Sequence, residues 1–282
     1  LLESEEIHLS DLISKYFPEF DTTEKDSVTV QHLLTHTSGF MAWKPFYLPQ
    51  SDKPKKENVL SQIAAASLAN PIGEKVVYSD FNFLLLGFLL EKITGKSLDD
   101  FAHEEVFEPL KLKNTFFNPP ANKKGRVAAS EKGNGFEKKT CIELGYLKLT
   151  ATADGSDRDS NRQSAFRSQI IWGEVHDNNC YFLDGVAGHA GLFSNVTEVH
   201  KMAEQFLAET TELLNPETCQ LFRKNFTPGL NQARSLAFQL AETEDSTASE
   251  VLWKDSFGHL GFTGTSLWIE PGNRRIFILL TN

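Results

Sequence analysis

The chain has 282 residues, of which 40% are hydrophobic, so it can bury a folded core and is not generally disordered. Its formal net charge of -10 repels phosphates, which argues against nucleic acid as a partner. The longest unbroken apolar stretch covers only residues 83–90, far below the ~20 residues that cross a bilayer, so no transmembrane segment is expected.

The first predicted element is a short amphipathic helix, because apolar side chains recur at helical spacing over residues 9–17. Thr29 is a suitable N-cap for a second helix. Ser38 follows that helix, and a hydroxyl in this place is predicted to satisfy backbone groups rather than attack a substrate. A third helix is predicted over residues 58–69, where an Asn-Pro-Ile-Gly sequence ends it.

The clearest element follows Tyr78 and Asp80, because the apolar run over residues 81–94 is too long for one strand and is closed by Gly95. The phenol of Tyr78 precedes the positive end of this predicted helix, which favours the phenolate and would make it a usable base. A tyrosine that merely packs at the helix entrance is the alternative. Ser97 begins an S-x-x-D capping pattern for the next helix.

Residues 118–167 are polar with little periodicity, and they predict a long excursion over the surface. Within them, Asp157, Asp159 and Asn161 resemble the first ligands of a calcium loop, but the later positions of that motif do not match. The calcium-like segment from Asp157 to Ser168 is therefore interpreted as a solvated loop.

The C-terminal part predicts helices over residues 196–207 and from Asn215, followed by a β-hairpin over residues 265–280. Before the hairpin, residues 258–265 contain glycines that would let a ligand approach backbone N–H groups, while His259 supplies a hydrogen-bonding side chain. An oxyanion-binding edge strand and an ordinary glycine-rich bend are both compatible with this pattern.

Eight histidines and three cysteines form neither an H-E-x-x-H motif nor a C-x-x-C pair. No metal site and no cofactor are therefore expected, and the cysteines indicate no disulfide framework and do not identify the compartment. A metal hydrolase that uses His176, His189 and His259 is a weaker alternative.

Several segments, taken in order, resemble the serine β-lactamase-related superfamily, which includes class C β-lactamases, penicillin-binding D,D-peptidases and related esterases. The similar segments cover nearly the whole chain: 28–39, 78–80, 93–97, 108–112, 173–177, 185–194 and 258–265. The resemblance implies an α+β fold, in which an antiparallel sheet flanked by helices lies beside a mostly helical lobe, with the site between them. It also implies a small-molecule or peptide acyl substrate, and a periplasmic or other extracytoplasmic location is compatible with it.

In that family a serine in an S-x-x-K motif attacks an acyl carbon, and a Y-x-N tyrosine handles the proton. By position, the resemblance makes Tyr78 that catalytic phenol and puts Asp80 in the place of the Asn, where it binds substrate. It puts His259 in the place of the Lys of K-T-G, as a second catalytic residue, and Gly261 in the place of its Gly. The N–H of Phe262 would be one of two oxyanion-hole donors.

Two of these residues depart from the family pattern. Asp80 replaces an amide by a carboxylate, and His259 replaces a permanent cation by a group that is only partly charged near neutral pH. Both changes argue against a dedicated penicillinase and favour an esterase or peptidase.

No serine among the 282 residues is followed by Lys at the third position. By resemblance, residues 1–282 are therefore expected to be one β-lactamase-related domain that lacks the nucleophile segment and the closing C-terminal helix. The full-length protein is then predicted to be a serine acyl hydrolase, whereas these residues alone would be nearly inert. A non-catalytic module that binds peptide or peptidoglycan is the alternative.

Overall fold

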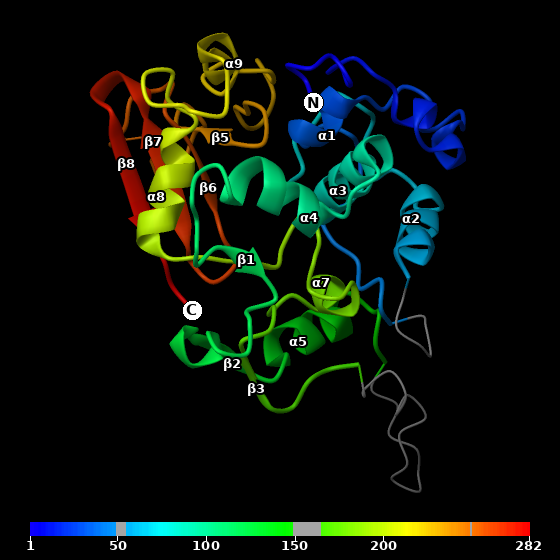
Figure 1. Ribbon diagram of the computed structural model, residues 1–282. Helices are drawn as coiled ribbons and strands as arrows, with labels where there is room; N and C mark the ends of the chain where they lie inside the picture. The colour runs from blue at the N-terminus through cyan, green and yellow to red at the C-terminus, as the bar shows by residue number, and fades with distance from the viewer. Residues whose placement is uncertain (49–54, 149–164, 249) are drawn as a thin grey trace, which may run out of the picture.

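The computed structural model describes residues 1–48, 55–148, 165–248 and 250–282. A four-stranded antiparallel sheet lies beside a mostly helical lobe (Figure 1), which confirms the predicted α+β class. The sheet has the order β5-β6-β7-β8, and its strands are β5 (Gln239–Leu240), β6 (Phe257–Leu260), β7 (Ser266–Glu270) and β8 (Arg275–Leu279). Two short antiparallel pairs join β1 (Phe116–Phe117) to β4 (Leu192–Phe193) and β2 (Ala129–Lys132) to β3 (Ile170–Trp172).

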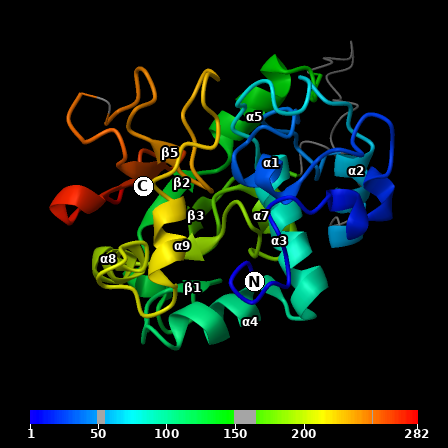
Figure 2. The same cartoon turned by 90° about the horizontal axis from the view of Figure 1, so that it is seen from above.

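The helices separate into groups that are visible from above in Figure 2, with α8 and α9 on the sheet side and the N-terminal helices opposite. The N-terminal group comprises α1 (Val30–Leu34), α2 (Lys56–Ala64), α3 (Asp80–Thr94) and α4 (Leu98–Ala102), with a π-helical turn at His103–Phe107. The remaining helices are α5 (Gly135–Glu143), α7 (Asn178–Phe182), α8 (Val196–Glu204) and α9 (Pro216–Leu221). None of the described helices combines the length and apolar character needed to cross a bilayer.

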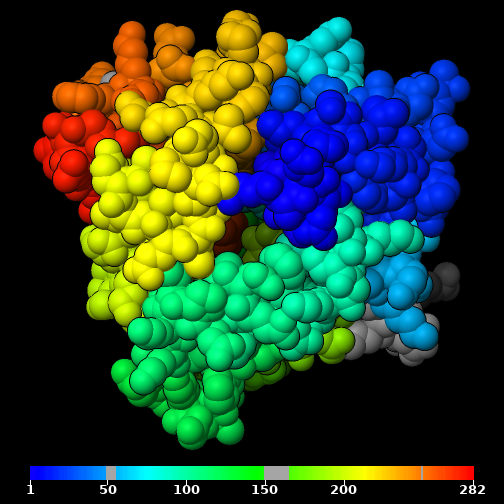
Figure 3. Space-filling view, turned by 45° about the horizontal axis from the view of Figure 1, so that its top comes forward, coloured from blue at the N-terminus to red at the C-terminus, as the bar shows by residue number. Residues whose placement is uncertain are grey.

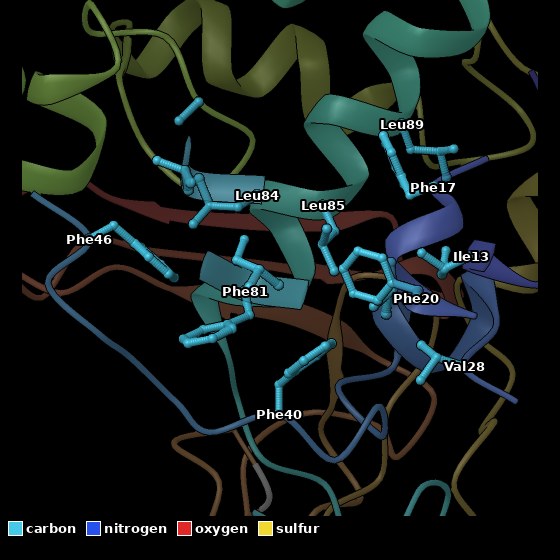
Figure 4. Packing of buried hydrophobic residues seen from close by; sticks show 14 of the residues in the cluster. Ile13, Phe17, Phe20, Val28, Phe40, Phe46, Phe81, Leu84, Leu85 and Leu89 are labelled. Atoms are coloured by element: carbon cyan, nitrogen blue, oxygen red, sulfur yellow. The ribbon is translucent and has the colours of Figure 1, made fainter. Parts of the chain in front are cut away.

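Helix α3 is the centre of the largest hydrophobic core, as its sequence predicts. Ser79 is its extended N-cap residue, and Gly95 ends it in the left-handed region at a φ of 69°. Leu84 and Leu85 are almost fully buried in a cluster that also contains Phe20 and Phe40 (Figure 4). Because this helix is held by buried side chains on several sides, the residues at its entrance have a well-defined position.

The predicted C-terminal hairpin is confirmed, with Ser266 opposite Leu279 and Glu270 opposite Arg275. Arg275 donates to the fully buried carboxylate of Glu270 at 2.6 Å, which neutralises a charge that would be costly to bury alone. Helix α8 packs against β8, and Ala203 contributes to the core under the sheet. The predicted starts of α8 and α9 are also confirmed.

Two predicted helices differ from the observed ones. Residues 9–17 form only a 3₁₀ turn at Ile13–Lys15, because Leu12 is extended and bridges to Thr29. The helix predicted over 58–69 begins at Lys56 and ends at Ala64, since the N–H groups of residues 69 and 70 donate instead to the Gly39 carbonyl. In both places backbone hydrogen bonds to a distant segment prevail over local periodicity.

The prediction that residues 118–167 form a long excursion over the surface with little periodicity holds only in part for the residues that the structure describes. This part contains β2 and α5, and Cys141 is buried there with Leu147 and Tyr47. The side chain of Arg167 is also buried and donates to two backbone carbonyls at 2.7 and 2.6 Å. The signal was missed because a few apolar residues suffice for a small cluster in a polar stretch. The calcium-like residues 157–161 lie outside the described residues.

Candidate active site

Tyr78 and His259 come from different parts of the fold and meet. Tyr78 precedes the N-cap of α3, whereas His259 lies in β6, and their ring centroids are 5.5 Å apart at an interplanar angle of 61°. The expected proximity of these two rings is therefore observed, although their catalytic roles stay predictions. Burial lowers the pKa of His259, and the charge of Arg234 lowers it further, so the imidazole is neutral near pH 7.

The prediction that the helix end favours the phenolate of Tyr78 is wrong. Partial burial and the nearby Asp80 carboxylate raise the pKa of Tyr78 to about 12, although Arg234 acts in the opposite direction. At neutral pH the side chain is therefore a phenol that can donate a proton. The α3 terminus contributes less than these groups because its effect falls off within the first turn.

His36 joins this site, although sequence reasoning assigned no chemical role to it. Its Nδ1 accepts hydrogen bonds from the Asn82 side-chain amide at 3.0 Å and from the Ser79 N–H at 3.2 Å. Burial, with the charges of Arg234 and His259, lowers its pKa to about 2, so the ring is neutral and carries its proton on Nε2. The ring centroid lies 4.6 Å from that of Tyr78, so His36 braces the entrance of α3.

Ser38 also supports this entrance rather than ending a helix. Helix α1 ends at Leu34, four residues earlier, and Ser38 is buried. Its hydroxyl donates to the Asn82 carbonyl oxygen at 2.6 Å. It also accepts the Phe40 N–H at 3.4 Å, so the predicted role of satisfying a backbone group is observed, although the C-cap of α1 is Thr35.

Arg234 is a further residue of the site that sequence reasoning missed. Only 5% of it is exposed, and its guanidinium carbon lies 5.8 Å from the ring centroid of Tyr78. Burial lowers its pKa to about 10, so it remains a cation at neutral pH. Its position in the chain, before β5, carries no motif, and only the fold brings it to Tyr78.

Asp80, Asp177 and His189 form a charged cluster on the other side of the α3 entrance, with ligand-type atoms all within 4.8 Å of one another. His189 Nε2 lies 3.0 Å from Asp177 Oδ1, which also accepts the Cys180 N–H. Burial alone would lower the pKa of His189, but the charge and hydrogen bond of Asp177 raise it above its usual value. Burial raises the pKa of Asp80 to about 6 despite the nearby His189, so this carboxyl titrates near neutrality.

The histidine set of the metal-hydrolase alternative is not brought together in the described part of the chain. His176 Nε2 pairs with Glu131 at 2.7 Å, and His259 faces Tyr78, whereas His189 lies with two aspartates. If a metal ion bound here, Asp80, Asp177 and His189 would be its ligands, which is a different set from the one expected. In the structure His189 instead neutralises part of the charge of the two carboxylates.

Gly261 and Phe262 form the open turn after β6. The Gly261 N–H donates to the Thr265 carbonyl at 2.6 Å, and the Gly264 N–H donates to the Gly261 carbonyl at 3.1 Å. Among the described residues no acceptor faces the Phe262 N–H. The Phe262 ring is 69% exposed and lies 5.0 Å, between centroids, from the ring of Phe136. The predicted oxyanion-hole role of this N–H remains a prediction.

The face of the molecule in Figure 3 is hollowed where the N-terminal residues (blue), the α8–α9 region (yellow) and the blue-green segment around α4 approach one another. A surface cavity of about 500 Å³ is lined by residues that include Asn118, Glu174 and Tyr181. Neither Tyr78 nor His259 lines this cavity, so the candidate site rests on side-chain geometry rather than on this cavity.

The family model described as Beta-lactamase matches residues 1–282. The chain belongs to the beta-lactamase family. It is 31% identical over its whole length to an Escherichia coli K12 protein named "Putative D-alanyl-D-alanine carboxypeptidase" and 30% identical to a Bacillus subtilis protein named N-acetylmuramyl-L-alanine amidase. The chain spans 64% and 63% of the length of these two relatives.

Solved structures have the same fold at lower identity. EstCE1, described as a hydrolase with promiscuous acyltransferase activity, has a TM-score of 0.67 at 20% identity, covering 99% of this chain and 74% of its own. A penicillin-binding protein homolog from Caulobacter crescentus has a TM-score of 0.64 at 16% identity, covering 98% and 71%. These likenesses confirm the β-lactamase-like fold that the sequence resemblance implied.

Proposed function

We propose that the full-length protein containing these residues is a serine acyl hydrolase that acts through an acyl-enzyme on ester, amide or D-amino-acid peptide substrates. The observation that carries the proposal is the 5.5 Å approach of the Tyr78 and His259 rings. Membership of the beta-lactamase family supports it, as do relatives named for peptidase and amidase activities.

In the proposed reaction a serine hydroxyl of an S-x-x-K motif outside these 282 residues passes its proton to the lysine of that motif, and its oxygen attacks the acyl carbon and expels the leaving group. Tyr78 is a protonated phenol at neutral pH, so its hydroxyl can donate a proton to the departing oxygen or nitrogen. The phenolate then formed lies near the cationic Arg234, which stabilises it. Water then attacks the acyl-enzyme and gives its proton to the phenolate, while the lysine returns its proton to the departing serine oxygen.

The Phe262 N–H is proposed to donate to the oxyanion that forms in each tetrahedral intermediate. One such donor typically contributes about 3 kcal/mol in the transition state. Gly261 lets the turn close tightly, because a Cβ there would lie only 3.1 Å from the Thr265 Cβ. Asp80 and the neutral His259 would contact the substrate, and neither offers the permanent positive charge of the usual lysine.

The test is an activity panel on the full-length protein, with short-chain esters, N-acetylated D-amino-acid peptides and a chromogenic cephalosporin as substrates. We expect turnover of an ester or peptide and slow turnover of the cephalosporin. A fluorophosphonate should label one serine, which peptide mass spectrometry would identify.

Absence of both turnover and serine labelling in a folded full-length protein would refute the hydrolase. That result would favour the alternative function, a module of the same fold that binds peptide or peptidoglycan without cleaving it. Turnover that persists after fluorophosphonate treatment but stops with a chelator would instead indicate metal chemistry at Asp80, Asp177 and His189.

A further inference from the structure

Two exposed aromatic rings from distant parts of the chain contact each other beside the candidate site. Phe136 lies in the first turn of α5, and Phe262 lies in the turn after β6. Their ring centroids are 5.0 Å apart at an interplanar angle of 64°. The His176 imidazole stacks on the Phe262 ring, with 5.9 Å between centroids and 21° between planes. We call Phe136, His176 and Phe262 the aromatic platform.

The open area of this platform is not covered by the rest of the described chain. Two other exposed aromatic rings have a cation over them, because Lys124 Nζ lies 5.3 Å from the Trp172 ring and the Arg275 guanidinium carbon lies 5.7 Å from the Phe277 ring. No cation of the described residues lies over either phenylalanine of the platform. A contiguous exposed apolar patch marks a binding surface more often than a scattered apolar side chain does.

The platform is held in place from two sides. Glu137, the neighbour of Phe136 in α5, accepts a hydrogen bond from the buried Tyr47 hydroxyl at 2.7 Å, which ties the start of this helix to the interior. His176 Nε2 lies 2.7 Å from a carboxylate oxygen of Glu131. Because the rings are positioned before a ligand arrives, binding on them costs little additional ordering.

The platform adjoins the groups of the proposed reaction. His176 precedes Asp177, whose carboxylate lies with that of Asp80 at the entrance of α3. The Phe262 N–H, the proposed oxyanion donor, belongs to the same residue as one of the rings, so a carbonyl oxygen bound there leaves its acyl carbon beside that ring. Since Tyr78 protonates the leaving group in the proposed reaction, the acyl chain is the substituent that remains for the platform.

We propose that the aromatic platform is the subsite for a medium-chain aliphatic or aromatic acyl group, with Phe136 as a specificity-determining residue. This inference rests on the proposed hydrolase function, because the bound carbonyl group places the acyl chain. Each CH₂ group that leaves water on the rings stabilises the bound substrate, and an aromatic acyl group can also stack there. The substrate class is therefore esters or amides of such acids, in preference to acetyl compounds.

The experiment compares p-nitrophenyl acetate with p-nitrophenyl hexanoate on the full-length protein, because the two esters share a leaving group and differ only in acyl chain length. We expect wild-type kcat/KM to favour the hexanoate by about tenfold, as for partial burial of the added CH₂ groups. Phe136→Ala should lower kcat/KM for the hexanoate by about fivefold and leave the acetate nearly unchanged. Phe136→Trp, which keeps a large ring, should preserve the preference.

Leu144→Ala is the matched control, because Leu144 lies at the other end of α5 and is 58% exposed, against 56% for Phe136. This variant should keep the wild-type preference. An equal loss on both esters in Phe136→Ala would mean that Phe136 contacts the leaving group or supports the fold, and it would overturn the inference. A wild-type protein that does not favour the hexanoate would also overturn it, and that comparison depends on no variant.

A binding measurement separates this inference from the proposed function. The ketone 2-octanone has a carbonyl group and an apolar chain but no leaving group, so it tests the platform without turnover. Saturation-transfer NMR on the full-length protein should show contact with its chain protons, which Phe136→Ala weakens and Leu144→Ala does not. Equal transfer in all three proteins would overturn the inference, while turnover of esters would still support the hydrolase. Chain contact that depends on Phe136 without turnover of any ester would support the platform and refute the hydrolase alone.

Discussion

At the entrance of α3, buried hydrogen bonds tie the chain to distant segments, whereas at the end of β6 the chain is open to solvent. Ser79 donates from its N–H to His36 and from its hydroxyl to the Met41 carbonyl at 2.6 Å. Across the site, Leu260 is 42% exposed and Phe262 is 69% exposed. One side of the candidate site is therefore fixed by the core, and the other is a turn whose apolar side chains are largely exposed.

In the proposed reaction, the two sides would meet different requirements of catalysis. A proton donor must be held in one place, because misplacement of a catalytic group by about 1 Å can cost 100-fold in rate. The side that receives substrate needs accessible N–H groups and room for the acyl chain. The entrance of α3 meets the first requirement, and the turn at Gly261 and Phe262 meets the second.

The largest expected effect is on the fixed side. In the full-length protein, Tyr78→Phe should lower kcat by about 10²–10⁴, because it removes the proton donor of the proposed reaction. The thermal midpoint should hardly change, since the Tyr78 hydroxyl has no hydrogen bond to a described residue. Steady-state kinetics and a melting curve on the same preparation check this, and unchanged kcat would remove Tyr78 from the mechanism.

The next largest effect is a loss of stability, which we expect to differ between a leucine in the α3 core and a leucine at the end of β6. Leu85→Ala should lower the free energy of unfolding by about 2–5 kcal/mol, because Leu85 is fully buried in the α3 core. Leu260→Ala is its matched control on the exposed strand and should cost at most about 1 kcal/mol. Urea unfolding measures both, and similar losses in the two variants would show that the sides are not different in rigidity.

The hydrogen bonds at the α3 entrance also predict a pH dependence. The pKa of His36 is about 2 in the folded chain and near 6.5 when unfolded, so between these values only the unfolded chain binds the proton. His36 therefore lowers stability as the pH falls through this window, by about 2 kcal/mol between pH 6.5 and 5. His36→Asn, which keeps a hydrogen-bonding side chain that tolerates the φ of 57°, should lack this contribution.

Urea unfolding of wild type and His36→Asn at pH 6.5 and pH 5 measures that contribution as a difference of differences. Asp80 changes stability in the opposite sense over part of the same range, but it is present in both proteins and cancels. Equal pH dependence in the two proteins would mean that His36 is not a buried neutral acceptor.

The smallest effect concerns Asp80. Its pKa of about 6 means that it can donate a hydrogen bond to a substrate carbonyl only below that pH. Asp80→Asn should donate at every pH, so the ratio of its kcat/KM to that of wild type should rise about tenfold as the pH passes through 6. A pH profile of both enzymes checks this, and a constant ratio would exclude contact between Asp80 and the substrate carbonyl.

The sequence by itself determined much of the fold. Sequence patterns predicted the caps and the apolar run of α3, the C-terminal hairpin and the order of the family segments. These predictions succeeded because local capping and periodicity agree there with the tertiary structure. Sequence prediction was less successful for residues 9–17, where a distant backbone partner decides the structure. It was also less successful for the described part of residues 118–167, where a few apolar residues form a small buried cluster.

The same division holds for the candidate site. Tyr78, Asp80 and His259 were found from sequence, because each stands in a recognisable pattern at the end of an element. His36 and Asp177 lie in family-like segments but were given no role from sequence, and Arg234 carries no pattern at all. Only the packing of α3 against β6 and their neighbours brings these three residues to the site. The protonation states of these residues could not be predicted from the sequence either. Burial and the distances between charges determine them, and both are properties of the folded chain.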